Sequence, residues 1–281
     1  MTGIALSWQQ AGVLTLAIGA VSVGLGAGGD RARRLAAFGR EATMISALYT
    51  LWQFAGELSV LGTTDAFHRA DWIERIERDW HLPSEAAVQR LLTSNAWTAQ
   101  FANIYYATMH FGVLFVFLLW LFIRHRDRYR PVRRVLALTT FVCLLIQLVS
   151  VAPPRLLPGY EDTAVKYGQS VYGFGFDADQ LSAMPSVHVA WAVLVGWSVW
   201  RIGSGRWRWL GPTHAVLTVL VVVATANHFW ADGLVAVAVL IACAAAERAG
   251  RAAVVRLRPQ VPVKIADPQQ LNASRKSGSL P

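Results

Sequence analysis

The stretch HFWADGLVAVAVLIACAAAER, residues 228–248, indicates the fold class of this chain. Its predominantly apolar run, 229–248, is long enough to cross a bilayer, because a hydrocarbon core of about 30 Å needs about 20 helical residues. His228 and Asp232 stand four positions apart at its start, so they share one face of a helix. Ionisable groups on membrane-spanning helices are costly and usually functional. The stretch therefore predicts a membrane protein and a candidate site together.

The composition of the whole chain agrees with a membrane protein. Of its 281 residues, 54% are hydrophobic and only 15% are charged, and 12 tryptophans suit anchoring at the bilayer interfaces. We expect an all-α, polytopic membrane bundle with six core transmembrane helices plus one N-terminal span. The expected spans lie at about 10–28, 42–62, 102–123, 134–152, 184–201, 209–226 and 229–248.

Charge alternates between the expected connections. The acid-rich connections are 63–101 and 153–183, and arginines cluster at 31–40, 124–134, 201–208 and 248–258. Because positively charged loops stay in the cytoplasm, we expect a multi-pass protein of the cell membrane with its N-terminus outside and its C-terminus in the cytoplasm. The basic residues behind the net charge of +9 then serve to orient the chain in the lipid bilayer, and no nucleic-acid partner is expected.

Three segments organise the chain. Residues 1–40 hold the extra N-terminal span and a basic cytoplasmic loop, 41–250 form the membrane domain, and 251–281 read as a disordered cytoplasmic tail. Within the domain, 63–101 is expected to be an outer interfacial segment containing one or two helices or a folded loop.

Two smaller features complete the organisation. Cys143 and Cys243 lie inside apolar runs and are expected to be small core residues without a disulfide. No cleaved secretory signal is expected, because no basic residue precedes the first apolar run.

The chemistry-bearing residues gather on the outer side of this topology. His188 lies near the outer start of the span at 184–201, while His228 and Asp232 begin the last span. Two imidazoles and a carboxylate can supply a nucleophile, an orienting group and a general acid for attack on a phosphate. A lone histidine at a helix end is more often structural, so the prediction depends on the three occurring together.

Other residues near that face could bind an anion. Arg155 could clamp a phosphate or reach the interface as a snorkelling side chain, and Ser186 could donate a hydrogen bond or cap a helix. Helix N-termini on this side would also favour an anion. His110 is either functional or bonded to a neighbouring helix, and a metal site of His110, His188 and His228 stays an alternative.

At these residues the sequence resembles the type 2 phosphatidic acid phosphatase superfamily, and within it the branch that includes inositol phosphorylceramide synthase. The resemblance covers about residues 40–250, so the expected membrane domain is phosphatidic acid phosphatase-like. The matching elements are Tyr106 to His110, Ala152-Pro153-Pro154-Arg155, Pro185-Ser186-Val187-His188 and His228 to Asp232.

The resemblance implies roles for individual residues. It makes His228 the nucleophile, Asp232 its orienting carboxylate and His188 the general acid, with no metal and no cofactor. The substrate would be a membrane lipid phosphate reached from the extracytoplasmic face. His110 and Tyr106 match the Tyr-x-x-x-His element and would border the substrate.

Two departures from the phosphatase branch favour the synthase-like branch. Val221 and Val222 stand where phosphatases have Ser-Arg, and the phosphatase first motif is missing on the outer side. Phosphate binding would then fall to Arg155 or Lys166.

We therefore expect a lipid phosphatase or inositolphosphotransferase that works through a phosphohistidine, with water or inositol as acceptor. A non-enzymatic transporter or lipid-binding protein, with the histidines as a proton relay, is the alternative. A metal or haem protein is a third class.

Overall fold

The computed structural model describes residues 6–59, 63–170 and 180–257, and the regular structure of these residues is helical. One isolated parallel bridge joins Val151 and Ser182. The chain divides into two compact units, 1–247 and 248–281.

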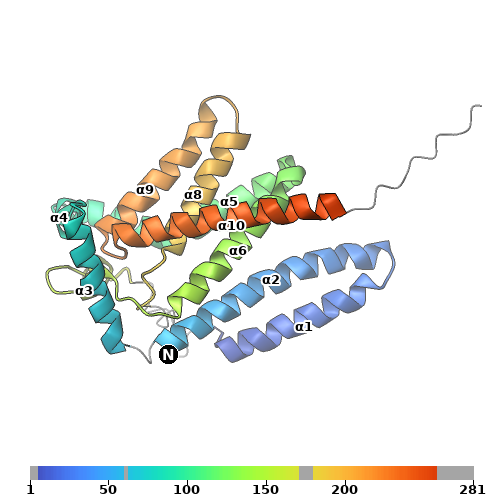
Figure 1. The fold of residues 1–281 in the computed structure, drawn as a ribbon, viewed down its shortest axis with the longest axis horizontal. Coiled ribbons are helices and arrows are strands. Elements are labelled where there is room, and N and C mark those ends of the chain that lie inside the picture. The colour runs from blue at the N-terminus through green and yellow to red at the C-terminus, as the bar shows by residue number, and fades with distance from the viewer. Residues whose placement is uncertain (1–5, 60–62, 171–179, 258–281) are drawn as a thin grey trace, which may run out of the picture. The chain divides into compact units, whose positions relative to one another are not determined.

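The helices are α1 (Trp8–Gly26), α2 (Asp30–Ser59), α3 (Thr63–Asp79), α4 (Glu85–Thr93), α5 (Ala96–Arg124), α6 (Arg126–Gln147), α7 (Thr163–Lys166), α8 (Val187–Ile202), α9 (Leu210–Ala224) and α10 (Trp230–Leu257), with the 3-10 turns η2 (Pro154–Leu156) and η5 (Gly205–Trp209) (Figure 1).

Four helical stretches of the described residues are long and apolar enough to cross a membrane. They are Trp8–Gly26, Ala96–Arg124, Gly205–Ala224 and Trp230–Arg256. The other three expected spans coincide with α2, α6 and α8. Of these, α8 has only 16 residues, and α2 and α6 begin with arginine-rich turns. The helical, multi-pass character agrees with expectation, and the count of six core spans plus one stays a prediction.

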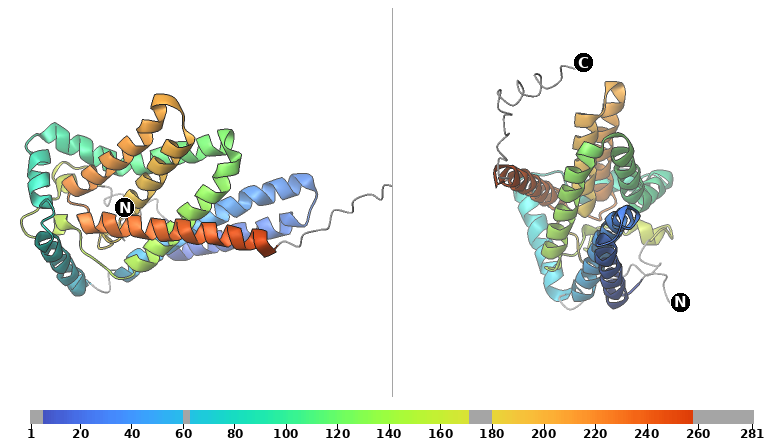
Figure 2. Two further views of the ribbon diagram at one scale, coloured as in Figure 1. Left: turned by 45° about the horizontal axis from the view of Figure 1, so that its top comes forward. Right: turned by 90° about the vertical axis from the view of Figure 1, so that its right-hand side faces the viewer.

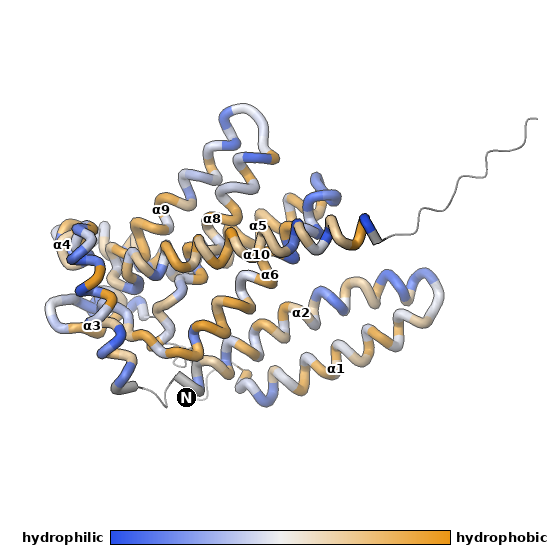
Figure 3. The backbone as a smooth tube through the Cα atoms, viewed as in Figure 1, coloured by the Kyte–Doolittle hydropathy of each residue, from blue (hydrophilic) through white to orange (hydrophobic). Residues whose placement is uncertain are grey.

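Hydrophilic residues concentrate at the turns that join consecutive helices and along α3 and α4. Figure 3 shows them at the turns between α1 and α2, between α5 and α6, and between α8 and α9, and again along α3 and α4. Figures 1 and 2 show these three turns away from α3 and α4. This separation is the arrangement that the alternating charge pattern predicts.

Two helix boundaries differ from the expectation. The helix α5 begins at Ala96, inside the expected interfacial segment 63–101, because the Asn95 side chain caps it by accepting a hydrogen bond from Trp97 N at 2.8 Å. The helix α10 continues to Leu257 and includes the start of the expected tail, since alanine, leucine and arginine there favour a helix. The remainder of that tail, 258–281, lies outside the described residues.

Small residues allow close helix contacts. Gly196 of α8 faces Gly211 of α9, and a Cβ on Gly211 would lie 2.7 Å from the Gly196 carbonyl oxygen. Gly39 of α2 packs in the same way against Ser22 of α1. Such contacts hold membrane helices together, because lipid provides no hydrophobic drive for their association.

The helix α3 forms one wall of the region that holds the histidines. Its buried face packs on the loops that precede η2 and α8 and on the start of α10, through a cluster of Ala66, Ala70, Ile73, Val151, Ala152, Leu157, Ala183 and Phe229. Arg69 Nε also donates to the Ser150 carbonyl at 2.6 Å. The opposite face leaves Trp72 and Trp80 more than half exposed. These exposed tryptophans suit the interfacial position expected of the segment 63–101.

Candidate active site

A tight turn between α9 and α10 presents His228. Ala226 adopts φ = 54°, in the left-handed region that a residue with a Cβ seldom occupies. The main-chain N–H groups of Asn227 and His228 both donate to the Val222 carbonyl, at 3.0 and 3.1 Å. The turn therefore reverses the chain and fixes the backbone of His228 against the end of α9.

The ring of His228 is held at its Nδ1 atom. Nδ1 lies 2.8 Å from the Ala183 carbonyl oxygen and 3.2 Å from Asp232 Oδ2, and His228 and Asp232 are both buried. A carbonyl oxygen can only accept, so Nδ1 carries the ring proton. The neutral ring then keeps its lone pair on Nε2.

His188 faces that lone pair. Its Nδ1 lies 3.4 Å from His228 Nε2, and because Nε2 of the neutral ring accepts, His188 Nδ1 is the donor. Ser186, fully buried, caps α8 by accepting from Val189 N at 3.4 Å. Ser186 N donates to the Asp232 main-chain oxygen at 3.1 Å, which ties the start of α8 to α10.

His110 and Tyr106 of α5 complete this group. His110 Nδ1 lies 2.8 Å from the Tyr106 carbonyl oxygen, so it donates there and Nε2 keeps the lone pair. The His110 ring meets the His188 ring edge to face with centroids 4.4 Å apart, and the Tyr106 ring lies 4.6 Å from that of His188. The structure thus brings three histidines into one contiguous row.

The two candidate cations lie in the preceding loop. Arg155, in η2, is buried, its Nε lies 3.3 Å from Asp162 Oδ2, and its main-chain N donates to the Ala226 carbonyl at 2.8 Å. That last bond places Arg155 beside the His228 turn. Lys166 pairs with Glu161 at 2.7 Å on the surface, and this hydrogen bond raises its pKa, so it stays charged.

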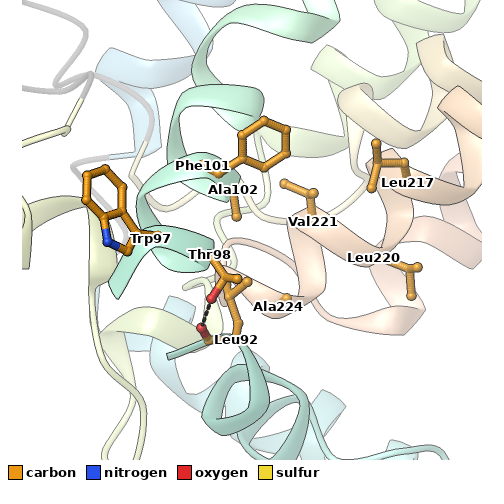
Figure 4. A pocket seen from close by; sticks show the side chains of 9 residues that line it. All are labelled: Leu92, Trp97, Thr98, Phe101, Ala102, Leu217, Leu220, Val221 and Ala224. Atoms are coloured by element: carbon orange, nitrogen blue, oxygen red, sulfur yellow. Dashed lines mark hydrogen bonds between the residues drawn. The ribbon is translucent and has the colours of Figure 1, made fainter. Parts of the chain in front are cut away.

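Two cavities lie close to the histidines. A small one of about 10 Å³ touches His110 and His188 and shares the side chain of Val221 with a much larger one. The larger cavity, about 400 Å³, lies between α4, α5 and α9 (Figure 4). Its lining is Leu92, Trp97, Thr98, Phe101, Ala102, Leu217, Leu220, Val221 and Ala224. Figure 4 shows its one polar side chain, Thr98, bonded to the Leu92 carbonyl at 2.6 Å.

The metal alternative finds no support among the residues described. In those ranges no group of three or more histidine, cysteine, aspartate or glutamate side chains could hold a metal ion. Cys143 and Cys243 are buried free thiols, as expected.

Sequence reasoning missed three side chains that support the site. Gln147 Nε2 donates to the Ser182 and Pro185 carbonyls at 3.3 and 3.0 Å, which holds the loop before His188. Glu77 and Glu85 belong to the acid-rich connection 63–101, yet both are buried against α10. The spacing of Glu77 from Ala66, Ala70 and Ile73 along α3 was the available signal, because it puts a carboxyl on the buried face.

Comparison with known proteins gives one match. A family model described as the PAP2 superfamily matches residues 71–246, which is more than half of the chain. The matched range includes the three histidines, Asp232 and Arg155. No curated protein and no solved structure matches.

Proposed function

The chain belongs to the PAP2 superfamily, and we propose that it breaks the phosphate ester or anhydride of a membrane lipid through a phosphohistidine on His228. Membership supports a phosphatase-type enzyme in a membrane. The single observation that carries the mechanism is the pair of contacts made by the His228 ring. Nδ1 bonds to the Ala183 carbonyl, which leaves a lone pair on Nε2 facing a donor nitrogen of His188.

In the first step His228 Nε2 attacks phosphorus, and a nitrogen–phosphorus bond forms as the bond to the leaving oxygen breaks. His188, protonated, gives its proton to that oxygen. Asp232 stabilises the positive ring of His228 through Nδ1. In the second step an acceptor hydroxyl loses its proton to His188 and attacks phosphorus, which frees His228.

Substrate binding in this proposal requires His228 and His188 to move apart. Attack needs phosphorus about 3–3.5 Å from the nucleophile, and the 3.4 Å contact between His228 and His188 leaves no room for it. A substrate phosphate would separate the two rings. His110 and Tyr106 border the place where it would lie, and a phosphate could draw Arg155 and Lys166 from Asp162 and Glu161 as its cations.

The larger cavity supports a lipid as substrate. It is apolar almost throughout, and Val221 lines both this cavity and the one beside His110 and His188. A hydrocarbon chain lying between α5 and α9 would have its phosphate end beside the histidines. Burying such a chain is favourable by about 0.8 kcal/mol per CH₂ group.

The acceptor separates two versions of the proposal. Water would make the chain a lipid phosphatase, and inositol or a lipid alcohol would make it a phosphotransferase of the inositol phosphorylceramide synthase type. Both share the first step. Their common site would face the extracytoplasmic side, with the C-terminus of the chain in the cytoplasm.

The test uses the purified full chain in detergent with a chelator. We would incubate it with phosphatidate, a polyprenyl phosphate, a polyprenyl diphosphate and phosphatidylinositol, with and without inositol, beside His228→Ala. The exposed residue His68 provides the matched control His68→Ala. We expect turnover and an acid-labile phosphoenzyme in the wild type and the control, and neither in His228→Ala. Free phosphate would indicate hydrolysis, whereas a new phosphoinositol lipid would indicate transfer.

Absence of turnover and of any phosphoenzyme would contradict the proposal. The three contiguous histidines would then favour a proton relay in a transporter, which needs no covalent intermediate.

A further inference from the structure

Two buried carboxyl groups meet the start of α10 from outside the histidine row. Glu77 lies in the last turn of α3 and Glu85 is the first residue of α4, and both are 3% exposed. Buried carboxyl groups are rare unless they are hydrogen-bonded or perform a function. The proposed reaction uses neither of them.

Their partners are main-chain N–H groups of the turn that carries the nucleophile. Ala231 N donates to Glu77 Oε1 at 2.6 Å, and Trp230 N donates to Glu85 Oε1 at 3.5 Å. Phe229 N donates to Asp232 Oδ2 at 2.9 Å. Three consecutive N–H groups, immediately after His228, are therefore held by carboxyl groups. These are the N–H groups that the first turn of a helix leaves without internal partners.

A further bond joins the same two segments. Trp230 Nε1 donates to the Pro83 carbonyl at 2.7 Å, in the connection between α3 and α4. The buried face of α3 also packs on Phe229. The α3–α4 pair thus contacts each of the three residues that follow His228.

Glu77 and Glu85 also interact with each other. Burial, followed by the neighbouring carboxyl group of Glu85, raises the pKa of Glu77 to about 9, and the charge of Asp232 adds to this while Ala231 N opposes it. At neutral pH Glu77 is therefore protonated. The other groups on this side are Tyr160, whose hydroxyl donates to Glu74 at 3.2 Å, and Arg78, which lies 3.7 Å from Glu74. Burial and these carboxylates raise the pKa of Tyr160 as well.

We propose that Glu77 and Glu85 are positioning residues: their two buried carboxyl groups accept hydrogen bonds from the first turn of α10, clamp it and so align His228 with His188. The inference rests on the proposed function, in which His228 is the nucleophile. Neither carboxyl touches the substrate. The clamp acts through the backbone of residues 229–231, on which the direction of the His228 ring depends.

The pair makes the alignment sensitive to pH. Above about pH 9 Glu77 loses its proton, and the charges of Glu85 and Asp232 then repel its buried negative charge. This repulsion would push Glu77 away from α10. Turnover by the wild type is therefore expected to fall on the alkaline side with a midpoint near the pKa of Glu77.

The experiment compares Glu77→Ala and Glu77→Gln with the wild type, using the lipid phosphate of the panel above that is turned over fastest. Because a small displacement of reacting groups can cost up to about 100-fold, we expect Glu77→Ala to lower kcat at least about tenfold while KM changes less than about twofold. Glu77→Gln keeps an acceptor for Ala231 N without a titrating proton. It should recover most of kcat and lose the alkaline fall. Asp71→Asn, on the exposed part of α3, is the control and should match the wild type.

Hydrogen exchange tests the clamp without turnover. Glu77→Ala should speed exchange in a peptide covering 226–233 and leave a peptide from the middle of α10 unchanged. If Glu77→Ala exchanges at the wild-type rate and keeps the wild-type kcat, the positioning role is overturned, even if the enzyme forms a phosphoenzyme. If the wild type forms no phosphoenzyme, the proposed function is contradicted instead. The hydrogen-exchange rates would still report on the clamp.

Discussion

At the scale of single residues, the tautomer of His228 is set by a main-chain oxygen. The Ala183 carbonyl accepts from Nδ1 at 2.8 Å, closer than Asp232 Oδ2 at 3.2 Å. Removal of the Asp232 charge would leave this carbonyl in place. In the proposed reaction the carboxylate would therefore contribute charge to the phosphorylated ring more than orientation.

A substitution at Asp232 separates these two contributions. In Asp232→Asn the Ala183 carbonyl still holds the proton on Nδ1 of His228. We therefore expect kcat to fall by about 10- to 100-fold, a smaller fall than in an enzyme whose catalytic histidine takes the wrong tautomer after such a substitution. Steady-state kinetics beside His228→Ala would measure this, with Asp127→Asn in the exposed α5–α6 turn as control. A loss as complete as that of His228→Ala would show that Asp232 alone sets the tautomer.

At the scale of helices, α5 and α9 line both cavities near the histidines. Both contribute apolar side chains to the 400 Å³ cavity, and both also contribute to the small cavity beside His188. The small cavity has a volume of about 10 Å³, room for about one water, so it is too small to hold a lipid chain.

Filling the larger cavity should select against long lipid chains. Leu220→Trp adds bulk to its lining, so kcat/KM for a long-chain lipid phosphate should fall about tenfold, equivalent to about 1.4 kcal/mol of lost transition-state stabilisation. A short-chain analogue should be turned over as before. The matched control is Val216→Trp, one turn earlier on α9 and outside that lining. Equal losses for both chain lengths would contradict a chain-binding role.

At the scale of the whole molecule, charge and site geometry point to one orientation. The basic turns lie away from α3 and α4 (Figures 1 and 2), and α3 and α4 contact the turn that carries His228. With basic loops in the cytoplasm, the histidines would lie at the outer face.

Labelling can test this orientation. Cys143 and Cys243 would first be replaced by alanine, and single cysteines introduced as Asp71→Cys in α3 and Asp127→Cys in the α5–α6 turn. A membrane-impermeant maleimide should label position 71 on intact cells and position 127 only after permeabilisation. The reverse pattern would place the histidines on the cytoplasmic side.

Local patterns were enough to predict part of this protein. Helical class follows from long apolar runs. The separation of four residues predicted that His228 and Asp232 pair on one helix face, and they do pair, but His228 lies in the turn before α10 and only Asp232 lies in the helix. Contact between His228 and His188 was also predictable, because charge alternation puts the starts of α8 and α10 on the same side.

Only the tertiary structure decided what surrounds those residues. The bond between Ala231 and Glu77 joins residues 154 positions apart, and that between His228 and the Ala183 carbonyl spans 45. The cavity between α5 and α9 likewise comes from packing. A periodic pattern reports which face of a helix is apolar, whereas the partner of a buried carboxyl depends on how distant segments pack together.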